Sequence, residues 1–174
     1  MQFVELENEL ASLKFLTQKD FEKLYAVASN AEIWAQHPDS SRYTLEGFST
    51  YFGKLLLTDC PFLIMDRSSK KIIGATSFYE YDSKQKSVAI GYTFLDTSYW
   101  GGMYNSSIKK LLLDYAFQFV DKVVFHVRDK NIRSQRALIK IGAQLENSYP
   151  NTMSTDSMQL EFVIHKSQYY KELI

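Results

Sequence analysis

The stretch that most constrains the fold is residues 87–143, where a strand pattern, a glycine turn and a helical stripe follow one another. Residues 87–95 are rich in β-branched and aromatic side chains, and the sequence YWGG at residues 99–102 indicates a turn. From about Met103 onward, apolar residues recur at helical spacing. The members of this apolar stripe are Ile108, Leu111, Leu112, Tyr115, Ala116 and Phe119. The pattern predicts a strand, a turn and a helix in that order.

A second strand and a second helix complete this unit. Residues 122–127 have a strand pattern, and residues 131–141 have a helical pattern that ends at Gly142. A crossover of this length indicates that the two strands lie parallel in one sheet, with the helix on one face. The turn then leaves a helix N-terminus at a strand end, where free N–H groups and the helix dipole attract phosphate. We therefore expect residues 101–105 to hold a phosphate-bearing cofactor, the alternative being a plain strand-to-helix turn.

Two familiar phosphate-binding motifs are absent. The Walker pattern GxxxxGK[ST] does not occur, and Gly101-Gly102 lacks the third glycine and the spacing of the dinucleotide fingerprint GxGxxG. The sequence therefore supports neither a P-loop protein nor a dinucleotide-binding domain.

The flanking sequence predicts further strands and helices around this unit. Apolar alternation predicts an edge strand at residues 9–15, and Thr17 is expected to cap a helix that runs to about residue 29. The other expected elements are a helical turn at residues 32–34, a helix at residues 45–57, hairpin strands at residues 61–66 and 71–80, and terminal strands at residues 144–149 and 157–165 joined by residues 150–156. We expect one α/β domain over residues 1–174, with a mixed sheet of about seven mostly antiparallel strands, a central parallel pair and about four helices.

Charge and hydropathy narrow the class of partner. The chain has 20 Lys and Arg residues and 20 Asp and Glu residues, so its formal charge is zero, which removes the general electrostatic argument for nucleic acid or an anionic membrane. No stretch reaches the roughly 18 consecutive apolar residues of a membrane span, and residues 1–15 do not resemble a secretory signal. We expect a cytoplasmic protein that binds a small organic or peptide substrate.

Cysteine and histidine usage predicts neither a disulfide nor a metal site. Cys60 is the only cysteine, so no intrachain disulfide can form, and it is a weak candidate nucleophile because no positioned histidine or acid is evident for it. His37, His126 and His165 lack metal-ligand spacing. We expect His126 to pack against a helix, the alternative being a role in a site.

Four short motifs follow one another along the chain. They are Ile90-Gly91-Tyr92, then Tyr99-Trp100-Gly101-Gly102-Met103-Tyr104-Asn105, then Asn131-Ile132-Arg133-Ser134, and finally Lys140-Ile141-Gly142-Ala143. In this order they resemble the IGY, YWG, NxxS and KxGA/F signatures of the GNAT superfamily of acyl-CoA-dependent N-acetyltransferases. The branch they resemble most is related to the ribosomal-protein N-terminal acetyltransferases. The resemblance implies acetyl-CoA as acyl donor and an amine as acceptor, and it leaves the oligomeric state open, a homodimer being common among relatives.

The resemblance also implies a cofactor site. In that family the pyrophosphate of CoA lies on backbone amides of a turn of the form [RQ]xxGx[GA]. The residues aligned with this turn are Trp100, Gly101, Gly102, Met103, Tyr104 and Asn105. Trp100 replaces the basic or amide residue, Met103 replaces a glycine and Asn105 replaces a small residue. Because phosphate is held by backbone N–H groups, these side-chain changes are compatible with binding.

The reaction implied is direct attack of an amine on the thioester. The family holds the thioester oxygen with a backbone N–H, which maps to Phe94 or Leu95. Asn131 corresponds to a residue that meets the CoA arm, although N-capping of its helix explains it equally well. Ser134 corresponds to a residue near the sulfur. Many relatives carry a tyrosine as the acid where this chain has Leu138, so Ser134 or a water would have to relay the proton.

The general base and the acceptor contacts are less defined by the motifs. Relatives often have a carboxylate just before IGY, where this chain has Ala89, and Glu80 is the carboxylate we expect nearest, with Tyr92 and Asp96 behind it. In the family the segment between the first two helices lies over the acceptor, and the candidates there are Trp34, His37 and Tyr43. The alternative for these residues is a structural role. The alternative for the whole chain is a non-catalytic acyl-CoA-binding or regulatory module of the same fold.

Overall fold

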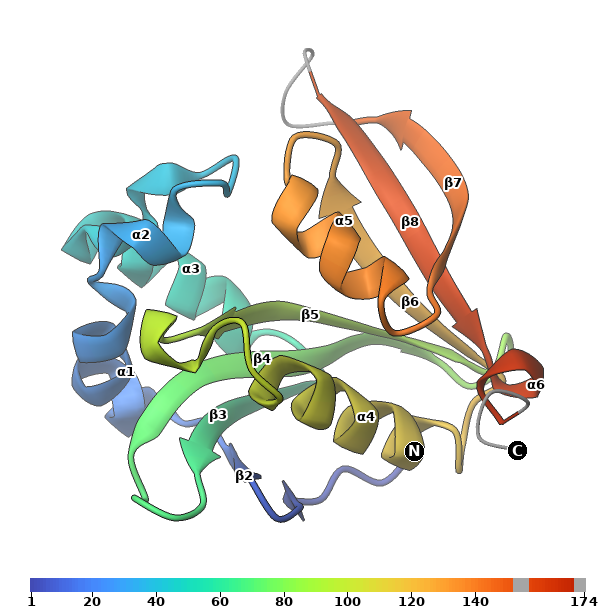
Figure 1. Cartoon of the computed structure of the whole chain (residues 1–174), viewed down its shortest axis with the longest axis horizontal. Coiled ribbons are helices and arrows are strands. Elements are labelled where there is room, and N and C mark those ends of the chain that lie inside the picture. The colour runs from blue at the N-terminus through green and yellow to red at the C-terminus, as the bar shows by residue number, and fades with distance from the viewer. Residues whose placement is uncertain (152–156, 171–174) are drawn as a thin grey trace.

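The computed structural model describes residues 1–151 and 157–170, and within them one mixed sheet of eight strands forms the centre of the molecule (Figure 1). The strand order is β1-β2-β3-β4-β5-β6-β8-β7. The strands are β1 (Leu6–Glu7), β2 (Ala11–Phe15), β3 (Cys60–Asp66), β4 (Ile72–Asp82), β5 (Ser87–Leu95), β6 (Lys122–Arg128), β7 (Gln144–Pro150) and β8 (Met158–His165). The α-helices are α1 (Phe21–Ala28), α2 (Ala31–Trp34), α3 (Leu45–Leu56), α4 (Tyr104–Ala116), α5 (Ile132–Ile139) and α6 (Lys166–Tyr169). Short 3-10 helices η1 (Gln18–Asp20), η2 (Ser40–Tyr43) and η3 (Thr97–Tyr99) connect them.

Helices cover both faces of the sheet, and each face has its own apolar cluster. Helices α1, α2 and α3 bury aromatic and aliphatic side chains against one face, where Leu63, Ala75 and Phe94 meet them. Helices α4 and α5 cover the opposite face, which presents Phe78 and Ile90 among others. This division follows from the strand period of two, which sends successive side chains to opposite faces. The face bearing α4 and α5 is toward the viewer in Figure 1.

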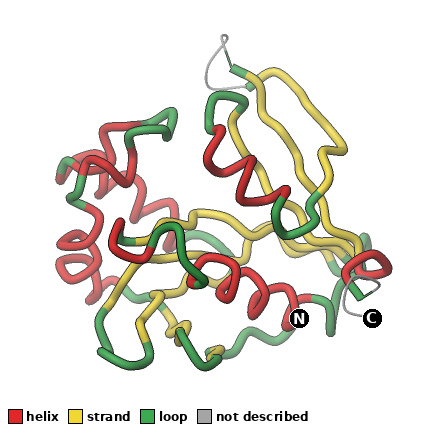
Figure 2. The backbone as a smooth tube through the Cα atoms, in the orientation of Figure 1, coloured by secondary structure: helices red, strands yellow, loops and turns green. Residues whose placement is uncertain are grey.

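The two central strands are parallel and pair over only a short distance. Ser87, Val88 and Ala89 of β5 pair with Lys122, Val123 and Val124 of β6, after which the strands separate. Figure 2 shows β5 and β6 diverging from this point. We call the unpaired arms, residues 90–95 of β5 and 125–128 of β6, the β5–β6 fork. Along the fork β5 remains paired with β4 and β6 with β8, so each arm has one sheet edge without a neighbouring strand.

A β-bulge at Tyr92 bends β5 where the fork opens. Ser77 pairs with Gly91 and Ala75 pairs with Phe94, so two residues of β5 oppose one of β4. Tyr92 has a φ of 53°, which is the left-handed region that non-glycine residues seldom occupy. The hydroxyl of Tyr51 on α3 donates a 2.5 Å hydrogen bond to the carbonyl oxygen of Tyr92. Helix α3 therefore holds the bulge in place.

The predicted parallel unit, the hairpin and the buried face of α3 are present, but the predicted numbers of strands and helices were low. The segment expected as an edge strand at residues 9–15 is β2, and it is covered by β1 through the pairs Leu6–Leu13 and Glu7–Ser12. The reason is a tight turn in which Asn8 Oδ1 accepts hydrogen bonds from the N–H groups of Leu10 and Ala11. The expected helix at residues 17–29 is divided into η1 and α1, and α6 was not predicted. The expected connection at residues 150–156 lies largely outside the described residues.

The apolar stripe predicted for α4 differs from the buried face at several positions. Phe119 lies beyond the end of the helix and is 40% exposed, whereas Leu113 is buried. Lys109 is also buried, with 6% of its surface exposed. Its Nζ donates a 3.0 Å hydrogen bond to Thr93 Oγ1, and burial lowers the pKa of Lys109 to about 7. No helix among the described residues is long and apolar enough to cross a membrane.

Replacing Lys109 with methionine is expected to change how stability depends on pH. An unfolded lysine has a pKa of about 10.4, so between about pH 7 and pH 10 the unfolded parent chain binds more protons than the folded one. The free energy of unfolding of the parent should therefore increase relative to that of Lys109→Met as the pH rises through this window. Below about pH 7 the difference between the two free energies should be constant. Urea unfolding of both proteins from pH 6 to pH 10 measures this, and a constant difference between them would contradict it.

Replacing Tyr51 with phenylalanine is expected to destabilise the protein by about 1–3 kcal/mol, because the carbonyl of Tyr92 loses its buried donor. Tyr43→Phe is the matched control, since Tyr43 is 43% exposed. Chemical unfolding of the two variants beside the parent provides the measurement. Equal losses in both variants would show that the hydroxyl of Tyr51 does not support the bulge.

Candidate functional site

The turn between β5 and α4 presents backbone rather than side-chain groups. Asp96 accepts hydrogen bonds from the N–H (2.9 Å) and Oγ (2.8 Å) of Ser98, which forms η3 and makes Asp96 a structural residue of the turn. Gly101 has a φ of 71°, a conformation that favours glycine. A Cβ on Gly102 would meet nothing within 4 Å. The turn therefore leaves space over its main chain.

Helix α4 begins at this turn without a side-chain cap. Met103 occupies the N-cap position, makes no capping hydrogen bond and is 70% exposed. Tyr104 is fixed by a 2.8 Å hydrogen bond from its hydroxyl to Asp66 Oδ1 and by edge contact with Tyr99. Asn105 follows in the first turn of the helix. The first N–H groups of an α-helix have no partner within it, so this end of α4 is suited to an anion.

Trp100 connects the turn to both the fork and α5. Its indole N–H donates a 2.9 Å hydrogen bond to the carbonyl oxygen of Leu95. The guanidinium of Arg133 on α5 lies 4.2 Å from the centre of the Trp100 ring, a cation–π contact. Trp100 stands where the family pattern has a basic or amide residue. Here it connects the two sides of the fork.

The register of β4 and β5 distinguishes the two residues predicted to offer a backbone N–H. A Cβ on Gly74 would lie 2.0 Å from the carbonyl oxygen of Phe94, so Phe94 directs its main chain toward β4. The N–H of Asp96 donates to the carbonyl of Ile73 on the same side. Because main-chain direction alternates along a strand, the N–H and C=O of Leu95 face the fork. Leu95, rather than Phe94, is placed to offer its backbone there.

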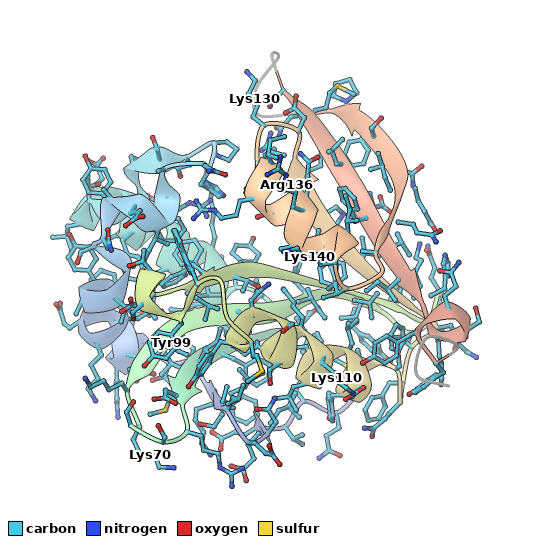
Figure 3. All side chains as sticks on the ribbon, in the orientation of Figure 1. Lys70, Tyr99, Lys110, Lys130, Arg136 and Lys140 are labelled. Carbon is cyan, nitrogen blue, oxygen red and sulfur yellow. The ribbon has the colours of Figure 1, made fainter. Side chains whose placement is uncertain are left out.

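Helix α5 lies along the β6 arm of the fork and carries much of the basic charge there. Asn131 is its N-cap and accepts a 3.2 Å hydrogen bond from the N–H of Ser134, which confirms the N-capping interpretation. Ser134 lies one turn before the buried Leu138, on the same side of the helix. The basic residues on or beside α5 are Lys130, Arg133, Arg136 and Lys140, three of which are labelled in Figure 3. Of these residues, Arg133 reaches the turn, through its contact with Trp100.

On the other face of the sheet, Glu80 and Tyr92 line one cavity of about 310 Å³. The full lining is Lys54, Leu57, Thr58, Asp59, Tyr79, Glu80 and Tyr92. Glu80 is exposed and, like Tyr92, has a φ of 53°. Burial raises the pKa of Tyr92, with a smaller contribution from the charge of Glu80. The structure thus brings together these two predicted residues, whereas Ser134 belongs to a helix on the opposite face.

A tyrosine–histidine pair joins the two arms beside this cavity. Tyr79 on β4 and Nδ1 of His126 on β6 lie 2.8 Å apart, and burial raises the pKa of Tyr79. A Cβ on Gly91 would lie 2.8 Å from the Tyr79 ring, so the glycine of the IGY motif provides the space for it. His126 therefore has a hydrogen-bonding partner on β4, a contact that the sequence pattern did not predict.

The segment between α1 and α3 contains the three predicted acceptor residues. Trp34 is 3% exposed and its indole N–H donates to the carbonyl of Ala28, whereas Tyr43 is 43% exposed. His37 contacts the edge of the Trp34 ring. Burial and the nearby charge of Arg42 lower the pKa of His37 to about 4, so its imidazole is neutral at pH 7.

Arg42, which no motif singled out, also belongs to the segment between α1 and α3. Arg42 lies over the rings of Trp34 and Tyr51, at 5.5 and 4.9 Å, and forms a 3.3 Å ion pair with Asp39. Cys60, in contrast, is buried, and burial raises the pKa of its thiol to about 12, which disfavours a nucleophilic role. Within the described part of the chain, no cluster of His, Cys, Asp or Glu could hold a metal ion.

Comparison with solved structures finds the same architecture in acetyltransferases. A GCN5-related N-acetyltransferase from Brucella melitensis is 18% identical, with a TM-score of 0.83 over 98% of this chain and 82% of that one. A GNAT-family acetyltransferase from Bacillus anthracis is 17% identical, with a TM-score of 0.75 over 94% and 99%. The spermidine N-acetyltransferase from Vibrio cholerae, solved with CoA and spermine, is 16% identical, with a TM-score of 0.71 over 94% and 99%. At these identities the likeness establishes the fold.

The sequence itself matches a family model. No curated protein gives a significant match to the chain. The model described as the acetyltransferase (GNAT) domain matches residues 12–144, which is well over half of the sequence and includes the turn, the fork and α5. The chain therefore belongs to the GNAT acetyltransferase family.

Proposed function

We propose that this protein is an acetyl-CoA-dependent N-acetyltransferase that acetylates a primary amine by direct attack. The observation that carries the proposal is the β5–β6 fork, which opens beside the uncapped N-terminus of α4 and the basic helix α5. The family uses acetyl-CoA, and CoA is present in the V. cholerae enzyme's structure. No metal is part of the proposal.

The cofactor site consists of the turn, the free edge of β5 and the start of α5. The backbone of Gly101 to Asn105 would hold the pyrophosphate, and the charges of α5 would favour the phosphates. Leu95 offers its backbone toward the fork, where an extended pantetheine arm would find unpaired main-chain groups. Asn131 and Ser134 begin α5 on the other side of that path, with Trp100 between the two.

Acetyl transfer needs three groups, and we assign one residue to each of them. The N–H of Leu95 would stabilise negative charge on the thioester oxygen. Glu80, in the cavity with Tyr92, would accept the proton that the attacking amine loses. Ser134 would hydrogen-bond near the sulfur. A serine hydroxyl passes a proton on but does not release one at neutral pH, so a relay through Ser134 requires a source.

The acceptor would approach on the face that carries α1, α2 and α3. His37 and the exposed Tyr43 would contact it, and the ring of Trp34 packs against His37. Both a protein N-terminus, as in the branch that the motifs resemble, and a small molecule fit an exposed segment of this kind. The V. cholerae relative acetylates spermidine, which is a primary amine. Cytoplasmic location and a homodimer accord with this proposal.

Binding and turnover of acetyl-CoA test the proposed function directly. Calorimetry should give micromolar affinity for acetyl-CoA, with adenosine 3′,5′-bisphosphate binding more weakly, and release of free thiol should follow when amines are screened. Binding without transfer to any amine would favour the second candidate, a non-catalytic acyl-CoA-binding module. That candidate is supported by the apolar Leu138, which is 5% exposed.

Replacing Gly102 with valine should weaken acetyl-CoA binding about tenfold without changing stability. A side chain at this position meets no other atom of the protein, so the fold should tolerate it, but it would occupy the space over the turn. Gly53→Val on α3 is the control for the added bulk, because Gly53 also has open space and lies away from the turn. Unchanged affinity in Gly102→Val would exclude the turn as the phosphate site.

Replacing Glu80 with glutamine should lower kcat by about 100-fold and leave the KM for acetyl-CoA within about threefold, because only proton acceptance is lost. Glu22→Gln, at an exposed position of α1, is the control. Steady-state kinetics at several pH values provide the measurement. A parent-like kcat in Glu80→Gln would remove Glu80 as the base.

A further inference from the structure

Lys109 is a buried amine at the point where the two arms of the fork separate. It lies on α4 among residues of the apolar cluster on the α4 and α5 face, including Ile108 and Leu112. Its Nζ reaches across to β5, where it donates a 3.0 Å hydrogen bond to Thr93 Oγ1, and lies 5.2 Å from the centre of the Phe125 ring on β6. Phe125 directly follows Val124, the last residue of β6 that pairs with β5. One ammonium group therefore contacts both arms.

The surroundings of Lys109 contain hydroxyls and an aromatic ring but no described counter-charge. Thr93 on β5 also shares a 2.8 Å hydrogen bond with Thr76 on β4, and Phe125 represents β6. On α4 itself the neighbouring Lys110 points to solvent and pairs with Asp114. Among residues 1–151 and 157–170, no carboxylate forms an ion pair with Lys109. An ammonium has three N–H donors, and one of them donates to Thr93, so Lys109 can donate a further hydrogen bond to an anion formed inside the fork.

The position of Lys109 relative to the proposed thioester site follows from β5. Thr93 and Leu95 are two residues apart on one strand, about 7 Å, and point the same way. A thioester whose oxygen is held at the N–H of Leu95 has its sulfur one bond length from the carbonyl carbon. Such a sulfur would lie beside the same stretch of β5 that holds the ammonium of Lys109 through Thr93. The burial that lowers the pKa of Lys109 to about 7 makes the group able both to give and to regain a proton near neutrality.

We propose that Lys109 is the catalytic acid that protonates the sulfur of the departing CoA, an inference that rests on the proposed acetyl transfer. The amine nitrogen bonds to the carbonyl carbon, the carbon–sulfur bond breaks and its electron pair stays on sulfur. The ammonium of Lys109 gives its proton to that sulfur, while the proton lost by the amine passes to Glu80. Lys109 is then protonated again from solvent. The products are CoA thiol and the N-acetylated amine.

This assignment supplies the proton source that Ser134 lacks. Ser134 and the apolar Leu138 lie on α5, across the fork from α4. Lys109 contacts both arms, is buried on the face where α4 and α5 meet the sheet, and carries a proton that it can give up. Ser134 then has the smaller role of a hydrogen-bonding partner for the CoA arm.

The test begins with a measurement that does not depend on turnover. CoA with its free thiol is bound to the parent protein and to Lys109→Met, and the thiolate is titrated by its ultraviolet absorbance. If the two groups are in contact, thiolate and ammonium stabilise each other, so the thiolate raises the pKa of Lys109 while the ammonium lowers that of the thiol. Thiolate should therefore appear at least one pH unit lower in the parent than in the variant. Lys110→Met, which removes a lysine from the exposed side of the same helix, should behave like the parent. Equal thiol pKa values in parent and Lys109→Met would overturn the assignment.

Kinetics then separate a catalytic from a structural effect. Lys109→Met should lower kcat at least tenfold with the KM for acetyl-CoA within about threefold, while thermal unfolding at pH 7 shows the variant to be at least as stable as the parent. In the parent, kcat should fall as the pH rises above the pKa of Lys109, because the acid is then deprotonated. In Lys109→Met this fall should be absent. A parent-like kcat would refute the role of Lys109 and leave the proposed function standing. A parent that binds no CoA, or binds it and acetylates no amine, would refute the proposed function first.

Discussion

The separation of β5 and β6 after three paired positions is the constraint on which the rest of the structure depends. A sheet edge inside a folded domain leaves main-chain groups that must find partners elsewhere. Here Trp100 provides one, through its bond to the carbonyl of Leu95, and the contact with Arg133 holds the tryptophan in that position. The remaining groups along the edge are what an extended ligand would use. The separation of β5 and β6 therefore exposes the main-chain groups that the proposed cofactor site uses.

The bulge at Tyr92 makes the separation possible. An extra residue in β5 increases its local twist and turns the strand away from β6. The hydroxyl of Tyr51 donates a hydrogen bond to the carbonyl oxygen of the left-handed residue Tyr92 and so fixes the bulge. Because Tyr51 belongs to α3 and Lys109 belongs to α4, the two helical layers contact the same strand from opposite faces. The proposed donor and acceptor sites meet at this strand, one on each side of the sheet.

Local patterns predicted much of this arrangement, because each depends on residues close together in sequence. The period of α3, the glycine turn and the N-cap at Asn131 are properties of a few neighbouring residues. Long-range relations were not accessible in the same way. The turn at Asn8 folds β1 back so that it pairs with β2. The apolar alternation at residues 9–15, which predicted an edge strand, therefore belongs to a strand inside the sheet. The Tyr79–His126 pair joins strands β4 and β6, and no periodicity connects them. Lys109 was missed because a lysine in a helical pattern is ordinarily taken as solvent-exposed.

Lys109 also bears on how this protein could be engineered. Natural sequences are rarely at their stability optimum, and replacing a buried, unpaired charge is among the simpler routes to a more robust fold. A selection that scored thermal resistance alone would therefore enrich apolar residues at position 109 and, on the assignment made above, would discard catalysis at the same time. Libraries built on this scaffold should hold that position fixed and seek added robustness at the surface.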